Sequence, residues 1–380
     1  MRSRSTIAIV GASARAAAFS TLRCGQQALT ADLFADADLR RQCPAVQIDD
    51  YPAGLLDWLT RTDCDGWLYT GALENVPELV DRMSEIRPLW GNPAEVLREV
   101  RSNVRLAKVL GQADLLFPES RLQSAGLPGD GSWLIKRNRS SSGSGVATLA
   151  ASEDTLHVGG DGDVSTTYQR RVEGVAASAV MVADGRRSAL LGVTRQLVGQ
   201  AWTGAAAFQY CGSIGPLALG PDVVAQIARI GDVLAESFGL CGLFGIDLVI
   251  DGSDVWTIEV NPRYTASVEV VERATGRNAI EAHLAACLQG RLCQPWLAQQ
   301  GCFGKAILFT KQPVQGADQL WDWALHQAGP IDQPHLADVP SAGTSLDMGS
   351  PVLTVFASGT TDGAVEAQLR RSMAKVQRRL

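Results

Sequence analysis

The 380-residue sequence has few histidines and no paired cysteine motif. Only 4 histidines occur, and none lies at metal-ligand spacing from another. The 8 cysteines are scattered without a C-x-x-C pair. Such scattering is typical of reduced thiols in a cytoplasm, rather than of a disulfide framework or a zinc site. These absences argue against zinc chemistry and favour a cytoplasmic protein.

The sequence also lacks an excess of positive charge and any long apolar run. There are 34 Lys and Arg against 40 Asp and Glu, which gives a net charge of −6. A nucleic-acid partner is disfavoured, because phosphates require a basic surface. Gly11 interrupts the apolar run near the N-terminus, so no signal peptide is predicted, and no stretch reaches the roughly 20 apolar residues of a membrane span. We expect a globular enzyme of two or three domains, without a membrane or nucleic-acid partner.

The first part of the chain alternates between strand-like and helix-like segments. Strand-like runs at residues 6–10 and 65–71 enclose a helix-like pattern at residues 55–61. This alternation predicts a parallel, doubly wound sheet. The first turn has a single glycine instead of G-x-G-x-x-G, which disfavours a nicotinamide-dependent oxidoreductase but leaves it as an alternative. The pattern changes at L-W-G-N-P, residues 94–110 are predicted to form one long helix, and we place a domain boundary near residue 95.

A glycine-rich segment, L-I-K-R-N-R-S-S-S-G-S-G-V, occupies residues 134–146. Lys136 ends a short apolar strand, and serines and glycines follow it. Such a loop can place successive backbone N–H groups around phosphate oxygens without side-chain collisions. A phosphate-binding loop is one interpretation, and a flexible hairpin is the other.

Two strands joined by D-G-S-D carry a set of polar residues near residue 250. Asp247 lies on the first strand, and Glu259 and Asn261 lie two residues apart on the second, so both point to one face. Three oxygen ligands converging there, with Arg263 after them, would suit Mg²⁺, which takes a few protein oxygens together with nucleotide phosphates. The alternative is a solvated hairpin edge.

The order of lysine, glycine-rich loop, carboxylate and E-x-N resembles the ATP-grasp superfamily over residues 95–300. The resemblance implies an α/β and α+β chain with the ATP-grasp fold, an N-terminal Rossmann-like parallel-sheet domain and a small C-terminal α+β extension. The implied units are a Rossmann-like domain at 1–94, a small lobe with a glycine-rich lid at 95–168, a large lobe with the metal site at 169–300, and the extension at 301–380.

The resemblance also implies cofactors, ATP with Mg²⁺ or Mn²⁺, and the residues that bind them. Lys136 is similar to the lysine that holds the α- and β-phosphates, and Lys108 to the first ATP lysine, with Arg105 as a competitor. Ala176 stands where the family often has a ribose-binding glutamate, so Glu173 is the replacement candidate. The implied nucleotide-binding residues are Lys108, Lys136, Ser140, Ser141, Ser142, Gly143, Ser144, Gly145, Gln169, Arg170, Val172 and Glu173, and the metal ligands are Asp247, Glu259 and Asn261.

The activity implied is formation of an amide from a carboxylate and an amine through an acyl phosphate, with release of ADP and phosphate. N-P-R resembles the carbamoyl-phosphate-synthetase-like branch. E-V-N-P-R-Y-T-A-S-V-E resembles ATP-grasp proteins of tetrahydromethanopterin- and methanofuran-linked metabolism, some of which join L-glutamate to tyrosine or tyramine. The chain is expected to bind only small-molecule substrates, alone or as a homodimer. The alternative is a degenerate ATP-binding regulatory module. The catalytic candidates are Lys136, Arg195 and Arg263, and the substrate-binding candidates are Ser13, Arg15, Arg195 and Tyr210.

Overall fold

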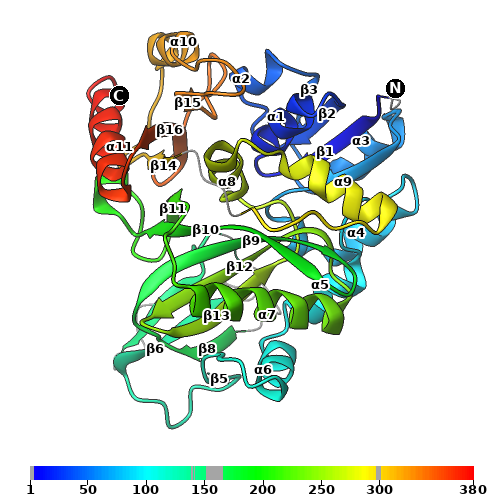
Figure 1. Cartoon of the computed structure of the whole chain (residues 1–380). Coiled ribbons are helices and arrows are strands. Elements are labelled where there is room, and N and C mark those ends of the chain that lie inside the picture. The colour runs from blue at the N-terminus through cyan, green and yellow to red at the C-terminus, as the bar shows by residue number, and fades with distance from the viewer. Residues whose placement is uncertain (1–3, 138–139, 141, 151–165, 297–300) are drawn as a thin grey trace.

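Three β-sheets organise the described part of the chain (Figure 1). The computed structural model describes residues 4–137, 140, 142–150, 166–296 and 301–380. The sheets have the strand orders β3-β2-β1-β4, β5-β8-β6-β7 and β13-β12-β9-β10-β11-β14-β16-β15. The mixed α/β and α+β class predicted from the sequence is confirmed.

The N-terminal sheet is parallel, as predicted. Its strand β1 is a continuous apolar run because both faces are covered, and Ile7 and Val10 are fully buried. Gly11 ends β1 with φ +140°, and a Cβ there would lie 2.2 Å from Thr70 Oγ1, so only glycine fits this close approach. The elements of this part are β1 (Thr6–Gly11), α1 (Arg15–Arg23), β2 (Gln27–Asp32), α2 (Ala37–Arg40), β3 (Ala45–Gln47), α3 (Leu55–Arg61), β4 (Gly66–Tyr69), the 3₁₀-helix η1 (Leu73–Asn75) and α4 (Pro77–Ser84).

The structure has two helices in the region where one helix was predicted over residues 94–110. They are α5 (Ala94–Val100) and α6 (Asn103–Gln112). Ser102 between them has an extended backbone, and its side chain accepts a hydrogen bond from the Arg105 N–H at 3.4 Å. The prediction of one helix was wrong because Ser102 caps a new helix instead of continuing the old one. Arg101 therefore lies at a bend.

A small antiparallel sheet follows. It consists of β5 (Ser120–Arg121), β6 (Asp130–Arg137), β7 (Val146–Ala150) and β8 (Thr166–Arg170). The glycine-rich segment connects β6 to β7. Lys136 on β6 lies opposite Thr167 on β8, so the lysine and Gln169 share one face of the sheet.

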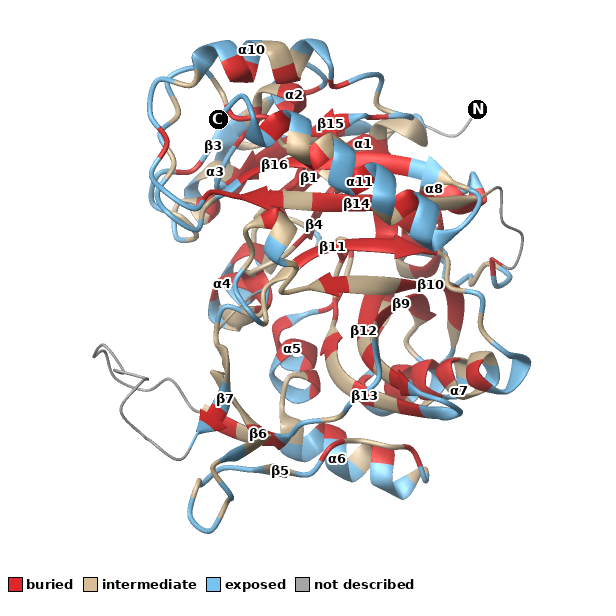
Figure 2. Ribbon diagram, turned by 90° about the vertical axis from the view of Figure 1, so that its left-hand side faces the viewer, coloured by how far each residue is buried: buried red, intermediate tan, exposed pale blue. Residues whose placement is uncertain are grey.

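The large sheet forms the centre of the molecule, and buried residues run along its strands (Figure 2). The period of two gives β9 two covered faces: Met181 packs with Ile227 of α7, and Val182 lies in the cluster that contains Ile280 of α9. The elements are β9 (Val175–Asp184), β10 (Ser188–Val198), the 3₁₀-helix η3 (Ala201–Thr203), β11 (Tyr210–Gly215), α7 (Pro221–Phe238), β12 (Cys241–Asp251), β13 (Asp254–Asn261), α8 (Val268–Thr275) and α9 (Ala279–Gln289).

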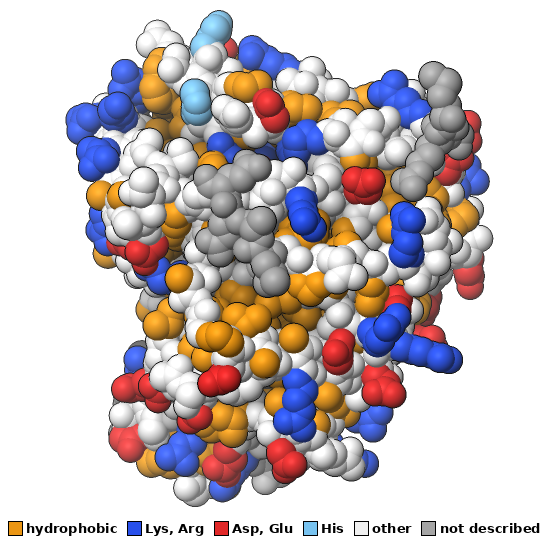
Figure 3. All heavy atoms as spheres, viewed as in Figure 1, with side chains coloured by type: hydrophobic (Ala, Val, Ile, Leu, Met, Phe, Trp, Pro, Cys, Tyr) orange, Lys and Arg blue, Asp and Glu red, His pale blue; other side chains and the backbone are white. Residues whose placement is uncertain are grey.

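The C-terminal part extends the same sheet, because β14 pairs with β11. The sheet thus continues across residue 300, and the division of the chain into four units stays a prediction. Basic and acidic side chains are interspersed on the face shown in Figure 3. Among the described residues, no helix combines the length and apolar character needed to cross a membrane. The C-terminal elements are β14 (Cys302–Phe309), α10 (Asp318–His326), β15 (Leu336–Ala337), β16 (Pro351–Gly359) and α11 (Asp362–Gln377).

Candidate functional site

Asp247, Glu259 and Asn261 lie together on the antiparallel pair β12 and β13. Asp247 is directly opposite Glu259 in the register of the two strands. Asn261 Nδ2 donates to Asp247 Oδ2 at 3.1 Å, and Gln196 Nε2 from β10 donates to Oδ1 at 2.8 Å. The alternation that placed polar residues on a strand face in the sequence therefore brings two carboxylates and an amide to one point of the sheet.

The two carboxylates repel each other. Burial and, after it, the negative charge of Glu259 raise the pKa of Asp247 to about 6, while Arg263 acts in the opposite direction. A cation placed between the two carboxylates would relieve this repulsion. The site thus has the electrostatic character of a cation site.

The side-chain oxygens of Asp247, Glu259 and Asn261 supply only part of the coordination that a hard cation requires. Carboxylate and amide oxygens are ligands that Mg²⁺ accepts, but it needs further oxygens from water or phosphates. Among the described residues, no group of three or more His, Cys, Asp and Glu side chains is arranged to hold a metal ion. In this structure Asn261 Oδ1 accepts from Arg263 Nη2 at 3.2 Å. The three residues would therefore bind a cation that brings other ligands, such as a nucleotide-bound metal.

Arg263 joins this set to the N-terminal sheet. Its Nε and Nη2 donate to Glu74 Oε1 at 2.8 and 2.6 Å. Glu74, in η1 after β4, is only 4% exposed. Burial alone would raise the pKa of Glu74, but the charge and hydrogen bonds of Arg263 hold that pKa below its ordinary value. The pair is therefore ionised, and it fixes the arginine between the two parts of the chain.

Arg101 is a second arginine at the site, and the sequence analysis missed it. Arg101 Nη1 donates to Glu259 Oε1 at 3.0 Å, and Nη2 donates to Asn75 Oδ1 at 3.1 Å. Glu74 and Asn75 were likewise not predicted from the sequence. The signal was available in T-G-A-L-E-N, where polar residues follow directly after the carboxyl end of β4, the edge at which open α/β sheets bind ligands.

Lys136 lies near the end of β6, and the described part of the glycine-rich loop after it contacts other parts of the molecule. Lys136 Nζ donates to Gln169 Oε1 at 3.1 Å. The Tyr210 N–H donates to the carbonyl oxygen of Ser142 at 3.0 Å, and Asn75 Nδ2 donates to that of Ser140 at 3.5 Å. Ser141 lies outside the described residues.

Glycine is required at one position of this loop. Gly143 has φ +78°, and a Cβ there would lie 2.0 Å from the carbonyl oxygen of Phe208. Ser144 and Gly145 complete the return to β7. The loop therefore packs its backbone directly against the segment before β11.

The end of β8 and the connector from β8 to β9 carry several of the residues predicted to bind the nucleotide. Arg170 ends β8, and its N–H donates to the carbonyl oxygen of Glu119 at 2.8 Å. Val172 is half-buried and Glu173 is exposed. This connector has no regular secondary structure and joins the small sheet to the large sheet, and its nucleotide role stays a prediction.

Four predicted residues lie apart from the carboxylate pair or are bound elsewhere. Lys108 is exposed on α6, and Arg105 pairs with Glu99 at 2.7 Å. Arg195 Nη2 donates to Glu366 of α11 at 2.7 Å, on the side of β10 opposite to its neighbour Gln196.

Arg15 is 1% exposed, because Glu269 and Asp338 bind its guanidinium. The remaining two candidates, Ser13 and Tyr210, lie after β1 and at the start of β11, and their role in substrate binding stays a prediction. Ser13 follows β1, and its carbonyl oxygen accepts from Thr70 Oγ1 at 3.0 Å. The Tyr210 hydroxyl lies 2.8 Å from Ser213 Oγ, and burial raises the pKa of this tyrosine.

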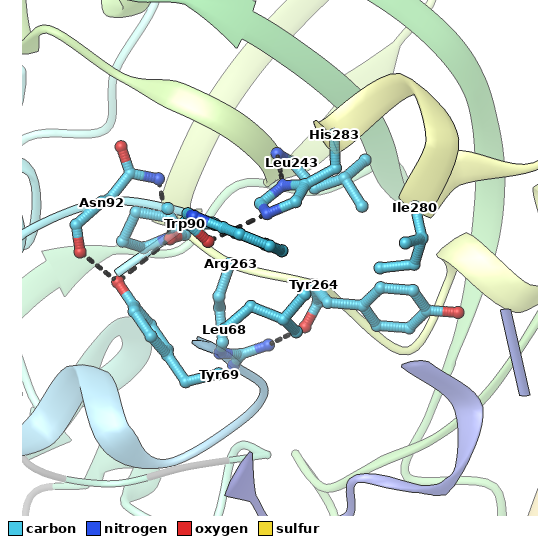
Figure 4. A pocket seen from close by; sticks show the side chains of 11 residues that line it. Leu68, Tyr69, Trp90, Asn92, Leu243, Arg263, Tyr264, Ile280 and His283 are labelled. Carbon is cyan, nitrogen blue, oxygen red and sulfur yellow. Dashed lines mark hydrogen bonds between the residues drawn. The ribbon is translucent and has the colours of Figure 1, made fainter. Parts of the chain in front are cut away.

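A small cavity is lined in part by Arg263 (Figure 4). Its volume of about 10 Å³ holds at most one water molecule, so it is no substrate pocket. Its walls are tied together by hydrogen bonds: His283 Nδ1 accepts from the Leu243 N–H at 2.8 Å, and Nε2 lies 2.9 Å from the Trp90 carbonyl oxygen. The Tyr69 hydroxyl donates to the carbonyl oxygen of Asn92 at 2.7 Å. The cavity is part of the rigid support behind the site.

The chain is similar to known proteins in sequence and in fold. The family model described as "ATP-grasp domain" matches residues 100–267. Over 95 residues the chain is 30% identical to the carbamoyl phosphate synthase large chain of Thermoplasma volcanium. This aligned stretch makes up 24% of the present chain. The matched stretch spans only 9% of that protein's length.

Solved structures match over nearly the whole chain. Phosphoribosylamine–glycine ligase from Thermotoga maritima has a TM-score of 0.70 at 16% identity. The alignment covers 97% of this chain and 96% of the ligase chain. L-amino acid ligase from Bacillus licheniformis has a TM-score of 0.70 at 14% identity, with 99% and 98% covered. These identities show a shared fold. The chain therefore contains an ATP-grasp domain at residues 100–267 and has the ATP-grasp fold as a whole.

Proposed function

We propose that this protein is an ATP-dependent ligase that joins a carboxylate to an amine and releases ADP and phosphate. The observation that supports this most is the set of Asp247, Glu259 and Asn261, which Arg263 links to the edge of the N-terminal sheet. Two proteins that share the fold are ligases by name, the phosphoribosylamine–glycine ligase and the L-amino acid ligase.

In this proposal the oxygen set, which consists of Asp247, Glu259 and Asn261, holds Mg²⁺ or Mn²⁺, and basic groups bind the phosphates. When bound, the cation neutralises charge on the phosphate oxygens. Lys136, the N–H groups of the glycine-rich loop and Arg263 bind the same oxygens and hold them in place. Phosphoryl transfer depends almost entirely on such positioning and charge stabilisation, so no side chain has to act as a nucleophile.

The proposed reaction has two steps. In the first, an oxygen of the substrate carboxylate attacks the γ-phosphorus of ATP, the bond to the bridging oxygen breaks, and ADP leaves. In the second, the amine nitrogen attacks the acyl carbon, the bond to phosphate breaks, and the nitrogen loses a proton. The products are an amide, ADP and inorganic phosphate.

The substrates are proposed to bind between the N-terminal sheet edge and the oxygen set, near Ser13 and Tyr210. Arg15 is buried among carboxylates of the chain, and Arg195 lies on the side of β10 opposite to Gln196, so neither is assigned to a substrate. L-glutamate with tyrosine or tyramine is the first pair to test, in a methanofuran-type biosynthetic setting. The resemblance of E-V-N-P-R-Y-T-A-S-V-E supports this choice. All eight cysteines are free thiols, which supports a reducing compartment such as the cytoplasm.

The proposal is tested by following the nucleotide products with ³¹P NMR while the protein is incubated with ATP, Mg²⁺ and pairs of amino acids and amines. We expect ADP and inorganic phosphate to form together, and only when both an acid and an amine are present. Formation of AMP and pyrophosphate would contradict the reaction class. ADP formed with a different acid or amine would change only the substrate assignment.

A further inference from the structure

Arg101 occupies a position between three parts of the site. It lies at the bend between α5 and α6, and its side chain is 15% exposed. One end of its guanidinium binds Glu259 Oε1 at 3.0 Å, and the other binds Asn75 Oδ1 at 3.1 Å. Asn75 in turn donates to the carbonyl oxygen of Ser140 in the glycine-rich loop at 3.5 Å. The arginine is therefore connected both to a candidate cation ligand and to the candidate phosphate loop.

A divalent cation and Arg101 compete for the same carboxylate. A cation on Glu259 takes the oxygen charge that the guanidinium now neutralises, because one carboxylate cannot fully satisfy both. Asn75 binds Arg101 from the opposite side and is itself bound to the loop backbone, so the guanidinium remains near the loop when Glu259 releases it. A guanidinium held there matches the paired oxygens of a phosphate group.

We propose that Arg101 neutralises Glu259 until a divalent cation binds, and that it then binds the terminal phosphates of the nucleotide. This inference rests on the proposed function. It assigns to Arg101 the role that the sequence had suggested for Lys108 or Arg105, both of which are exposed on α6. The bend at Ser102 turns Arg101 toward Glu259, whereas Arg105 points to Glu99.

The test measures two affinities of the full chain that change in opposite directions. Mn²⁺ binding without nucleotide is followed by electron paramagnetic resonance, and binding of a non-hydrolysable ATP analogue with Mg²⁺ is followed by calorimetry. We expect Arg101→Met to strengthen Mn²⁺ binding several-fold, because Glu259 loses its competing partner. The same variant should weaken analogue binding by about 10-fold to 100-fold, because a hydrogen-bonded charge contact is lost.

Two further variants separate this role from a general effect on folding. Arg105→Met removes a neighbouring exposed arginine and should change neither affinity. Arg101→Lys keeps the positive charge, so Mn²⁺ binding should remain near that of the unchanged protein, while analogue binding weakens because the planar fork is lost.

The outcomes distinguish this inference from the proposed function. If the unchanged protein binds both Mn²⁺ and the analogue but Arg101→Met leaves both affinities as they were, the role of Arg101 is wrong and the proposed function stands. A fall in both affinities with Arg101→Met also contradicts the competition. If the unchanged protein binds the analogue with Mg²⁺ but does not bind Mn²⁺ alone, the competition for Glu259 is contradicted and the proposed function stands. If it binds neither Mn²⁺ nor the analogue, the proposed function and this inference both fail.

Discussion

Asp247 and Glu259 are two carboxylates held opposite each other on neighbouring strands, where packing alone would favour apolar side chains. The chain supplies an arginine near each: Arg263 lowers the pKa of Asp247 against burial, and Arg101 binds Glu259 directly. Removing one of these charged side chains leaves the charge of its neighbours less well compensated. Each of these four residues therefore depends on the others, and substitutions among them should not have additive effects.

His283 gives a prediction about acid stability. Burial lowers the pKa of His283 to about 4 from its ordinary value of 6.5. The folded protein keeps the ring neutral, whereas the unfolded chain takes up a proton as the pH falls below 6.5. This contribution to stability is therefore complete above pH 6.5 and is lost as the pH falls toward 4, by about 2 kcal/mol between pH 7 and pH 5.

The measurement is urea unfolding of the unchanged protein and of His283→Gln at pH 7 and pH 5. We expect the variant to be less stable at pH 7, because the hydrogen bonds to Leu243 and Trp90 are weakened, but to lose less stability on acidification. Equal losses in both proteins would show that His283 does not titrate as described.

At the residue scale, the sequence allowed the oxygen set to be predicted but not its ionic partners. Glu259 and Asn261 are two positions apart, so the strand period alone places them on one face. Arg101 and Glu259 are 158 residues apart, and Glu74 and Arg263 are 189 apart. Pairings at such separations follow from the fold as a whole and leave no local pattern.

At the scale of elements, a buried ionic cluster joins α1 to α8 and to the C-terminal strands. Arg15 opens α1 and binds Glu269 of α8, which also accepts from Lys305 Nζ of β14 at 3.1 Å. Burial alone would raise the pKa of Glu269, but Arg15 and Lys305 hold that pKa well below its usual range. Asp338, after β15, binds Arg15 Nε at 2.8 Å from the other side. The cluster fixes how the N-terminal helix sits on the large sheet.

This cluster predicts a large effect of Glu269→Gln on stability. The variant leaves two buried cations with one carboxylate fewer, and breaking such a buried arrangement costs about 3–5 kcal/mol. Arg98→Met is the matched control, because Arg98 and its partner Asp81 are both largely exposed and such pairs contribute about 0–1 kcal/mol. The midpoint of urea unfolding should fall clearly for Glu269→Gln and little for Arg98→Met. Similar midpoints for the two variants would contradict the structural importance of the cluster.

The order of the elements was easier to predict than their connections. Strand β4 and helix α3 fall within or at the predicted segments, because turn residues and apolar periods mark them locally. The break before α6 was missed, since a single capping serine in a charged helical pattern is a weak signal. The pairing of β14 with β11 joins strands that are about 90 residues apart, and no local pattern specifies such a neighbour.

At the scale of the whole molecule, the N-terminal part lies against the large sheet (Figure 1). Asn92 Nδ2 donates to the Pro262 carbonyl oxygen at 2.9 Å, and Asn92 Oδ1 accepts from the Cys241 N–H at 2.8 Å. One side chain thus connects the end of the N-terminal part to the start of β12 and the end of β13. The loop with Arg263 is held from both sides, as a preorganised site requires.

The central claim is that Asp247, Glu259 and Asn261 bind a nucleotide together with a divalent cation. Calorimetric titration of a non-hydrolysable ATP analogue in the presence of Mg²⁺, and again in EDTA, tests it most directly. We expect binding with Mg²⁺ and about 100-fold weaker binding in EDTA, a difference of about 2.7 kcal/mol. Glu259→Gln should reduce this difference, because one charged ligand of the cation is lost. Asp254→Asn, on the same strand but exposed at its start, should behave as the unchanged protein. Equal affinity with Mg²⁺ and EDTA, or an unchanged Mg²⁺ dependence in Glu259→Gln, would contradict the account.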